Sequence, residues 1–282
     1  EPARAIIASV LGGKGLTFAV MMSRQAGKNE TSAQVEAYLL NLFQRAGGFI
    51  VKAAPTYLPQ TVNSRLRLEE VLGNPWNRGR WQREGHMVRL GKARVAFFSA
   101  HPEANVMGAT ANILLECDEA QDVPEDKWNK DFRPMAASTN ATTVLWGTAW
   151  TSRTLLARTV RALRQEEARD GMERVFIVPW QRAAAENPDY GTYVRGEIER
   201  LGRDHPLIRT QYFLEELETR GGMFPLTRQA QMRGKHAGYH QAQPGKSYAL
   251  LIDVAGEDET LEGDILRAVQ PRRDSTTLTV VE

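Results

Sequence analysis

The feature that most constrains the fold is the stretch TFAVMMSRQAGKNE at residues 17–30, an apolar run that leads into a turn ending in Gly27 and Lys28. Residues 18–22 have the length and composition of a fully buried strand, and apolar residues recur at helical spacing over residues 31–42. A strand, a glycine-lysine turn and a helix, in this order, are typical of loops that bind nucleotide phosphates. An ordinary loop-to-helix turn is the alternative.

The turn carries the groups that a phosphate requires. Its backbone N–H groups and the positive end of the following helix would surround a phosphate, while the Lys28 ammonium would reach the terminal phosphates. Two positions depart from the GxxxxGK[ST] pattern, since Met22 replaces the first glycine and Asn29 replaces the hydroxyl residue that contacts Mg²⁺. The candidate nucleotide-binding residues are Ser23, Arg24, Gln25, Ala26, Gly27, Lys28, Asn29 and Glu30.

Composition places the chain among soluble globular proteins. Of its 282 residues, 42% are hydrophobic and 25% charged, and the net charge is +2. No apolar run approaches the roughly 18 residues of a membrane span and no leader pattern is present, so we expect a cytoplasmic protein. The single cysteine, Cys117, excludes an internal disulfide framework and a multi-cysteine metal site. A nucleic-acid partner would have to meet local basic patches.

A second apolar run, residues 113–117, ends in the adjacent carboxylates Asp118 and Glu119. At the carboxyl end of a strand beside the phosphate loop, the first carboxylate would hold Mg²⁺ and the second would polarise the attacking water. We therefore assign Asp118 to the metal and Glu119 to the general base. A solubilising surface pair is the alternative.

Further elements follow from the same patterns. Residues 143–149 form a strand that would bring Thr148 to the same edge of the sheet, where its hydroxyl would sense the terminal phosphate; a strand ending at a turn is the alternative. Ser152 is expected to cap a helix that runs to Asp170. Other expected elements are strands at residues 49–54 and 174–179, a helix at residues 61–72 and two helices within residues 187–217.

Basic residues gather in two places. Residues 74–94 interleave arginine and lysine with Trp76 and Trp81, and residues 86–98 are expected to form a hairpin. This mixture suits nucleic-acid contact, or it is an exposed hairpin that is basic by chance. Arg65 and Arg67 lie on the helix at residues 61–72, either as a solvated face or as contacts to a polyanion.

With these stretches in view, the sequence resembles the large terminase subunit of tailed double-stranded DNA bacteriophages. Residues 23–28, SRQAGK, resemble that family's arginine-containing phosphate loop, and residues 114–121, LLECDEAQ, its acidic strand. Gly147-Thr148-Ala149 is similar to the coupling motif, and residues 212–217 followed by residues 223–224 resemble the exit from the motor domain. Asp253 and Asp274 are similar to the first acids of the nuclease.

The resemblance implies an α/β fold: a P-loop ATPase of the additional-strand (RecA-like) type with a mainly parallel sheet, at residues 1–224. A linker at residues 225–246 and the truncated start of an RNase H-like nuclease at residues 247–282 would follow. ATP hydrolysis would drive viral double-stranded DNA into a procapsid, with ATP and Mg²⁺ as cofactors. Arg24 would neutralise charge on the transferred phosphate, and Asp253 and Asp274 would bind the nuclease metals, Mg²⁺ or Mn²⁺.

The implied partners are DNA, the portal protein and the small terminase subunit. The implied assembly is a homo-oligomeric ring on the portal in the cytoplasm of the infected bacterium. The sequence departs from the family pattern at Met107-Gly108, where a basic residue is expected before the glycine, and so names no trans-acting arginine. Two alternatives stay open: a helicase-like DNA-dependent ATPase, and a nucleotide-binding switch without turnover.

Overall fold

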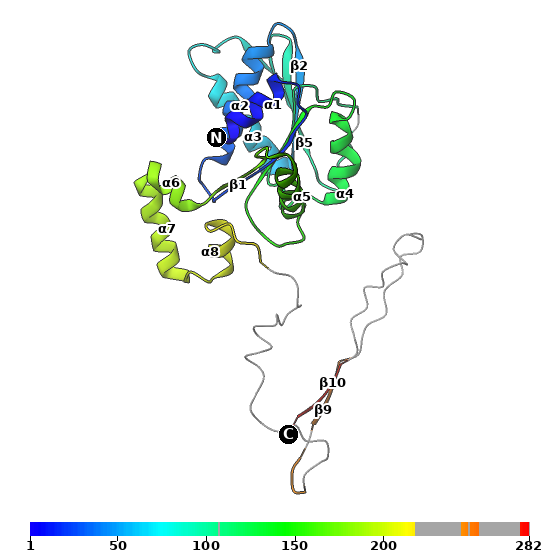
Figure 1. Cartoon of the computed structure of the whole chain (residues 1–282), viewed down its shortest axis with the longest axis vertical. Helices are drawn as coiled ribbons and strands as arrows, with labels where there is room; N and C mark the ends of the chain where they lie inside the picture. Colours follow the sequence, from blue (N-terminus) through cyan, green and yellow to red (C-terminus); the bar gives the residue numbers. More distant parts are fainter. Residues whose placement is uncertain (107, 218–243, 248, 254–276, 282) are drawn as a thin grey trace. The chain divides into compact units, whose positions relative to one another are not determined.

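The computed structural model describes residues 1–106, 108–217, 244–247, 249–253 and 277–281 (Figure 1). The chain divides into two compact units, Glu1–Pro225 and Leu226–Glu282, which are described separately. None of the helices in the described ranges combines the length and the apolar character that a membrane crossing requires.

Alternating apolar strands and amphipathic helices build the first unit around one eight-stranded sheet, in the order β3-β4-β5-β2-β6-β7-β1-β8. The strands from β5 to β8 in this order run parallel, and β3 and β4 add an antiparallel hairpin at one edge. The strands are β1 (Thr17–Met22), β2 (Gly48–Ala54), β3 (Trp81–Glu84), β4 (Met87–Leu90), β5 (Ala93–Ser99), β6 (Leu114–Cys117), β7 (Thr142–Gly147) and β8 (Val175–Val178).

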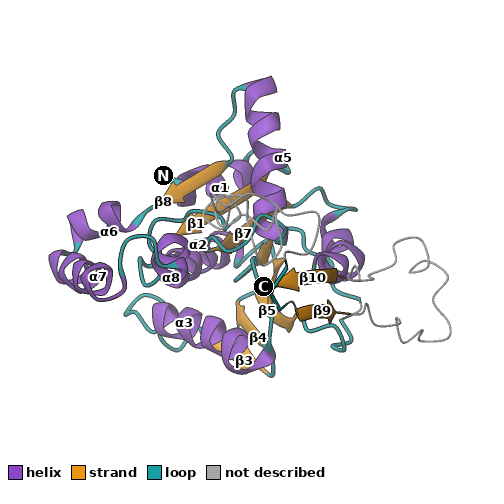
Figure 2. Ribbon diagram, turned by 90° about the horizontal axis from the view of Figure 1, so that it is seen from below, coloured by secondary structure: helices purple, strands orange, loops and turns teal. Residues whose placement is uncertain are grey.

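Helices cover both faces of this sheet. The helices of the first unit are α1 (Pro2–Leu11), α2 (Lys28–Phe43), α3 (Val62–Leu72), α4 (Glu125–Lys127), α5 (Leu155–Asp170), α6 (Trp180–Glu186), α7 (Pro188–Leu201) and α8 (Pro206–Gln211), with short helical turns η1 (Tyr57–Thr61), η2 (Trp128–Phe132) and η3 (Arg133–Ala136). Of these, α6, α7 and α8 pack around a separate apolar cluster. Figure 2 shows α5 and α3 on opposite sides of the strands.

The two faces have separate apolar cores, because alternate strand residues point to opposite sides of a sheet. One core joins α1, α2 and α3 to the sheet, with Leu39, Leu68 and Trp146 fully buried. The other packs α5, η2 and η3 against the opposite face, around Phe132 and Leu156. Because the sheet is packed between these two cores, the ends of its strands are held in fixed positions.

The strand order places β7 between β1, which carries the phosphate loop, and β6, which carries the acidic pair. Both neighbours of β7 run parallel to it, so all three strands end at the same edge. This inserted strand defines the additional-strand arrangement, and the predicted α/β class with a mainly parallel sheet is confirmed.

Three details differ from the sequence predictions. Helix α2 begins at Lys28 itself, because Gly27 adopts a left-handed conformation that starts the helix there. The cap of α5 is Thr154 and not Ser152, since the Thr154 hydroxyl accepts a hydrogen bond from the Ala157 amide at 3.2 Å. Strand β3 extends the predicted hairpin by a third strand.

In the second unit, β9 (Ala249–Asp253) pairs antiparallel with β10 (Thr277–Val281). Thr277 lies opposite Asp253 in this pairing. Asp274 and most of the expected linker lie outside the described residues. The nuclease assignments of Asp253 and Asp274 therefore stay predictions.

Candidate nucleotide-binding site

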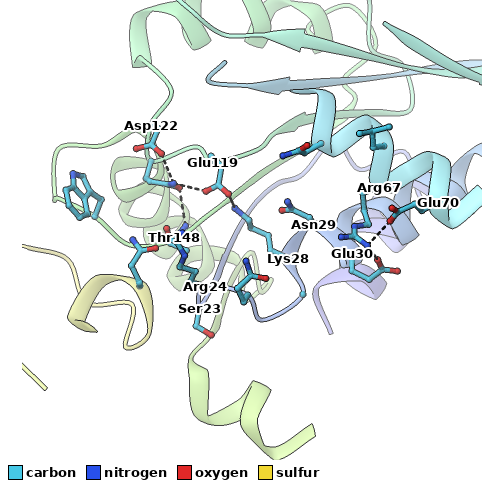
Figure 3. A pocket seen from close by; sticks show the side chains of 17 residues that line it. Ser23, Arg24, Lys28, Asn29, Glu30, Arg67, Glu70, Glu119, Asp122 and Thr148 are labelled. Carbon is cyan, nitrogen blue, oxygen red and sulfur yellow. Dashed lines mark hydrogen bonds and ion pairs between the residues drawn. The ribbon is translucent and has the colours of Figure 1, made fainter. Parts of the chain in front are cut away.

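The carboxyl ends of β1, β6 and β7 open onto a cavity of about 790 Å³ (Figure 3). Ligands of open α/β sheets bind at this edge, where loops leave the strands. The cavity is lined by Ser23, Arg24, Gln25, Gly27, Lys28, Asn29, Glu30, Asn63, Leu66, Arg67, Glu70, Glu119, Gln121, Asp122, Thr148, Trp150 and Gln211.

The phosphate loop, residues 23–28, is shaped by backbone conformations that few residues tolerate. Gln25 and Gly27 both have positive φ, 62° and 88°. Only glycine adopts such a φ without strain, so Gly27 suits the position that turns the chain into α2. The carbonyl of Gly27 accepts hydrogen bonds from both the amide and the hydroxyl of Thr31, at 2.9 and 3.0 Å. The first amides of α2 stay available for a phosphate.

Lys28 makes the central electrostatic contact of the site. Its Nζ lies 2.5 Å from Oε1 of Glu119 and 3.4 Å from Oδ1 of Asp118. The Lys28 side chain is 9% exposed, so water screens these contacts weakly. The phosphate-loop cation and the two carboxylates therefore meet in space, as Figure 3 shows for Lys28 and Glu119.

Asp118 contacts Lys28 but does not line the cavity. Its carboxylate accepts hydrogen bonds from the Ser64 hydroxyl at 2.9 Å and from the Glu119 amide at 3.0 Å. Burial alone would raise the pKa of Asp118, but the Lys28 and Lys52 charges and the Ser64 hydrogen bond lower it below its ordinary value of 3.8. Asp118 is therefore ionised at neutral pH.

Glu119 combines an unusual backbone with an accessible side chain. Its φ of 47° is left-handed, which is uncommon outside glycine and clusters at functional sites. The carboxylate is 26% exposed and faces the cavity. Its second oxygen, Oε2, accepts a hydrogen bond from Gln121 at 2.8 Å. Glu119 therefore faces the cavity, where its carboxylate can contact a water, while Lys28 and Gln121 each contact one of its two oxygens.

Several cavity residues were not predicted as part of the nucleotide site. Helix α3 contributes Arg67, which pairs with Glu70 at 2.8 Å and approaches Glu30 at 3.7 Å. Arg65, on the same helix, instead pairs with Glu69. Amphipathic periodicity indicated the helix, but nothing in it showed which exposed residues would face the phosphate loop. Gln121 lies within residues 118–121, DEAQ. Its closeness in sequence to the acidic pair was the only feature of the sequence that pointed to a place in the site.

A buried polar cluster lies under the phosphate-loop helix and was also not predicted. Lys52 of β2 pairs with Glu36 of α2 at 2.7 Å and donates to the Ser32 hydroxyl at 2.7 Å. Glu116 of β6 accepts from Ser32 at 3.0 Å and from the Trp146 indole at 2.8 Å. The cluster ties α2 to three strands of the sheet. Its members looked like ordinary polar positions in the sequence.

Buried charge shifts the pKa values within this cluster. Burial and the neighbouring Glu36 charge raise the pKa of Glu116 well above 4.5. For Lys52, burial opposes the charged form, but the Glu36, Glu116 and Asp118 carboxylates raise its pKa. The charged form of Lys52 is therefore stabilised by the carboxyl groups around it.

The structure brings most of the predicted nucleotide residues together. The cavity includes Ser23, Arg24, Gln25, Gly27, Lys28, Asn29, Glu30, Glu119 and Thr148, whereas Ala26 and Asp118 lie outside its lining. Within the described ranges, no group of three or more histidine, cysteine, aspartate or glutamate side chains is arranged to hold a metal. The roles assigned to the individual residues stay predictions.

Comparisons with known proteins agree with this architecture. A scan against protein-family models gave no match, and neither did a search of curated protein sequences. Among solved structures, the Thermus phage P74-26 large terminase ATPase domain matches with a TM-score of 0.57 at 16% identity, covering 72% of this chain and 89% of that one. The chain therefore has the large terminase ATPase fold. The resemblance inferred from the sequence is confirmed at this level.

Two longer proteins share the fold. The HK97 bacteriophage large terminase matches with a TM-score of 0.57 at 14% identity, over 76% of this chain and 50% of that chain. The large terminase of a thermophilic bacteriophage, solved in complex with ADP, matches with a TM-score of 0.54 at 13% identity, over 87% and 60%. This chain thus spans about half to three-fifths of the length of these two terminases.

Proposed function

We propose that the chain is an ATPase whose hydrolysis of ATP drives double-stranded DNA translocation in phage packaging. The observation that carries the proposal is the contact of Lys28 with Asp118 and Glu119, in which Lys28 and Glu119 line the cavity. A phosphate-loop cation and a cavity carboxylate supply charge neutralisation and water activation, which together are what phosphoanhydride hydrolysis requires.

In the proposed reaction the triphosphate lies against the amides of residues 23–28 and the first turn of α2. The terminal phosphate offers Lys28 an acceptor that competes with Glu119, so the carboxylate is released to accept a proton from a water. The water oxygen bonds to the terminal phosphorus, the bond from phosphorus to the bridging oxygen breaks, and ADP and phosphate form. Arg24, which also lines the cavity, would neutralise charge on the transferred phosphate.

The residues present fit a Mg²⁺ ion that accompanies the nucleotide. Hard oxygen ligands suit Mg²⁺, and Asp118 and Asn29 supply a carboxylate and an amide oxygen. Each Asp118 oxygen accepts one side-chain or backbone hydrogen bond, which leaves lone pairs for a cation. When bound, Mg²⁺ would lower the charge of the phosphates, and Thr148 would lie beside the terminal one.

The partners belong to the same proposal. Double-stranded DNA, the portal protein, the small terminase subunit and a ring of copies in the host cytoplasm follow from the terminase interpretation. A nuclease that uses Asp253 and Asp274 with Mg²⁺ or Mn²⁺ is proposed for the full-length protein.

Of the alternatives, a helicase-like ATPase would need a second sheet of the RecA type, and the described residues contain one. A switch without turnover would not need Glu119 in the cavity.

Phosphate release from ATP by the purified chain tests the proposal. Lys28→Ala is expected to abolish nucleotide binding and turnover, whereas Glu119→Gln keeps binding and loses about 10²–10⁴ in rate. Lys130→Ala, at an exposed lysine that does not line the cavity, is the matched control and is expected to behave as wild type. Normal turnover in Glu119→Gln would exclude the base assignment. Stimulation by added double-stranded DNA tests the translocation substrate.

A further inference from the structure

Gln121 makes three hydrogen bonds that converge on the site. Its Nε2 donates to Oε2 of Glu119 at 2.8 Å and to Oδ2 of Asp122 at 3.0 Å. Its Oε1 accepts from the backbone amide of Thr148 at 3.1 Å. One carboxamide therefore joins the loop after β6 to the end of β7. In Figure 3 dashed lines mark these hydrogen bonds at the labelled Glu119, Asp122 and Thr148.

These contacts fix the Glu119 carboxylate from the side away from Lys28. Lys28 contacts Oε1 of Glu119, while Gln121 contacts Oε2. When a phosphate draws Lys28 away, the Gln121 hydrogen bond still orients the carboxylate. Orientation matters, because misplacement of a reacting group by about 1 Å can cost about 100-fold in rate.

The backbone around Gln121 is itself anchored. The Ala120 amide donates to the Trp146 carbonyl at 2.9 Å, and the Asp122 amide donates to the Glu119 carbonyl at 2.9 Å. Gly147 provides the room, since a Cβ there would overlap Oε1 of Gln121. The position of the carboxamide is thus set by β7 and not by its own rotamer preference alone.

We propose that Gln121 is a positioning residue for the Glu119 base: its amide N–H group holds Oε2 while its carbonyl is fixed by the Thr148 amide. This inference rests on the proposed ATPase function. Gln121 would act through Glu119, without contact to the nucleotide phosphates. Its loss would therefore lower kcat while the KM for ATP stays close to the wild-type value.

Three substitutions separate this role from simple packing. Gln121→Met keeps the length of the side chain and removes its hydrogen bonds. Gln121→Glu keeps an oxygen that accepts from Thr148 but cannot donate to Glu119. Gln165→Met, at an exposed glutamine of α5, is the matched control. Steady-state ATP hydrolysis, the affinity for a non-hydrolysable ATP analogue and Tm are measured for each.

Both Gln121 variants are expected to lose about 10–100-fold in kcat, with KM and analogue affinity within about twofold of wild type. In a Glu119→Gln background, Gln121→Met is expected to cause little further loss, because residues that act as one unit are not additive. Wild-type kcat in Gln121→Glu would overturn the inference, as would an additive loss in the double variant. An absence of turnover in the wild-type chain would instead overturn the proposed function on which the inference rests.

Discussion

The hydroxyl of Tyr190 donates a hydrogen bond of 2.8 Å to the backbone carbonyl of Arg24. The same hydroxyl lies 3.1 Å from the Ser23 hydroxyl, and the Arg24 amide donates to the Gln211 carbonyl at 2.8 Å. Helices α7 and α8 therefore hold the start of the phosphate loop from outside the sheet. The loop conformation depends on residues more than 160 positions away in the chain.

Tyr190→Phe is expected to weaken nucleotide binding about fivefold. The variant keeps the ring and loses the hydroxyl contact, and a hydrogen bond of this kind contributes about 1 kcal/mol. Equilibrium binding of a fluorescent ATP analogue measures the change. Tyr57→Phe, at a tyrosine that is 52% exposed, is the control and should bind as wild type. Equal affinities for wild type and Tyr190→Phe would show that the contact does not shape the loop.

The sequence predicted the parts of the site that follow one another along the chain. The apolar run of β1 with Gly27 and Lys28, and the apolar run of β6 with its acidic pair, are local patterns with a direct physical meaning. Their convergence followed from one rule, that parallel strands end at a common edge. The fold class was predictable for the same reason.

The unpredicted parts depend on contacts between distant segments. Tyr190 reaches Ser23 across 167 positions, and the Ser32 hydroxyl reaches Glu116 across 84. Neither pair has a local signature, because an amphipathic helix indicates its buried face but not its partner. The misplaced cap of α5 has a different cause. Ser152 and Thr154 are both good cap residues, and the backbone conformation decides between them.

Lys28→Met is expected to lose more stability at pH 7 than at about pH 2. Lys28 helps to lower the pKa of Asp118 below 3.8, so the stabilisation is present above that value and is lost as the pH falls through the lowered pKa. Without Lys28, burial raises the pKa of Asp118 and leaves its charge less compensated, at a cost of about 1–3 kcal/mol. Protonation at low pH relieves this cost.

Urea unfolding at the two pH values measures that difference, with Lys130→Met as the control for loss of an exposed lysine. The control is expected to unfold as wild type at both values. A deficit in Lys28→Met that is equal at both, or larger at about pH 2, would contradict the electrostatic coupling of Lys28 and Asp118.

Within the buried cluster, Lys52→Met and Glu116→Gln are expected to differ sharply. Lys52→Met leaves the buried Glu36 carboxylate unpaired and should cost about 3–5 kcal/mol. Glu116→Gln keeps the oxygen that accepts from Ser32 and Trp146, and burial already disfavours the charged form of Glu116, so its cost at low pH should be small.

The pH dependence of Glu116→Gln gives the stricter check. A raised carboxyl pKa means that the stability of the wild type is complete below 4.5 and is lost as the pH rises through the raised value. The glutamine removes this loss, so in denaturant unfolding the difference in free energy of unfolding should shift in favour of the variant as the pH rises above 4.5. If the free energy of unfolding of the variant instead falls relative to wild type as the pH rises, Glu116 is ionised in the folded protein.

Gly147→Ala is expected to lower kcat by displacing Gln121. The added Cβ would overlap Oε1 of Gln121 and lie 2.6 Å from Cδ2 of Leu156, so at least one of these side chains must shift. If the shift falls on Gln121, the variant loses turnover as Gln121→Met does, and the two changes together are no worse than either alone.

Gly196→Ala is the control, since a Cβ there meets nothing within 4 Å and alanine suits the interior of α7 better than glycine. Kinetics and Tm measured side by side separate the two sources of loss. A Gly147→Ala variant with reduced Tm and wild-type kcat would place the shift on Leu156 and leave the Glu119 carboxylate where it is.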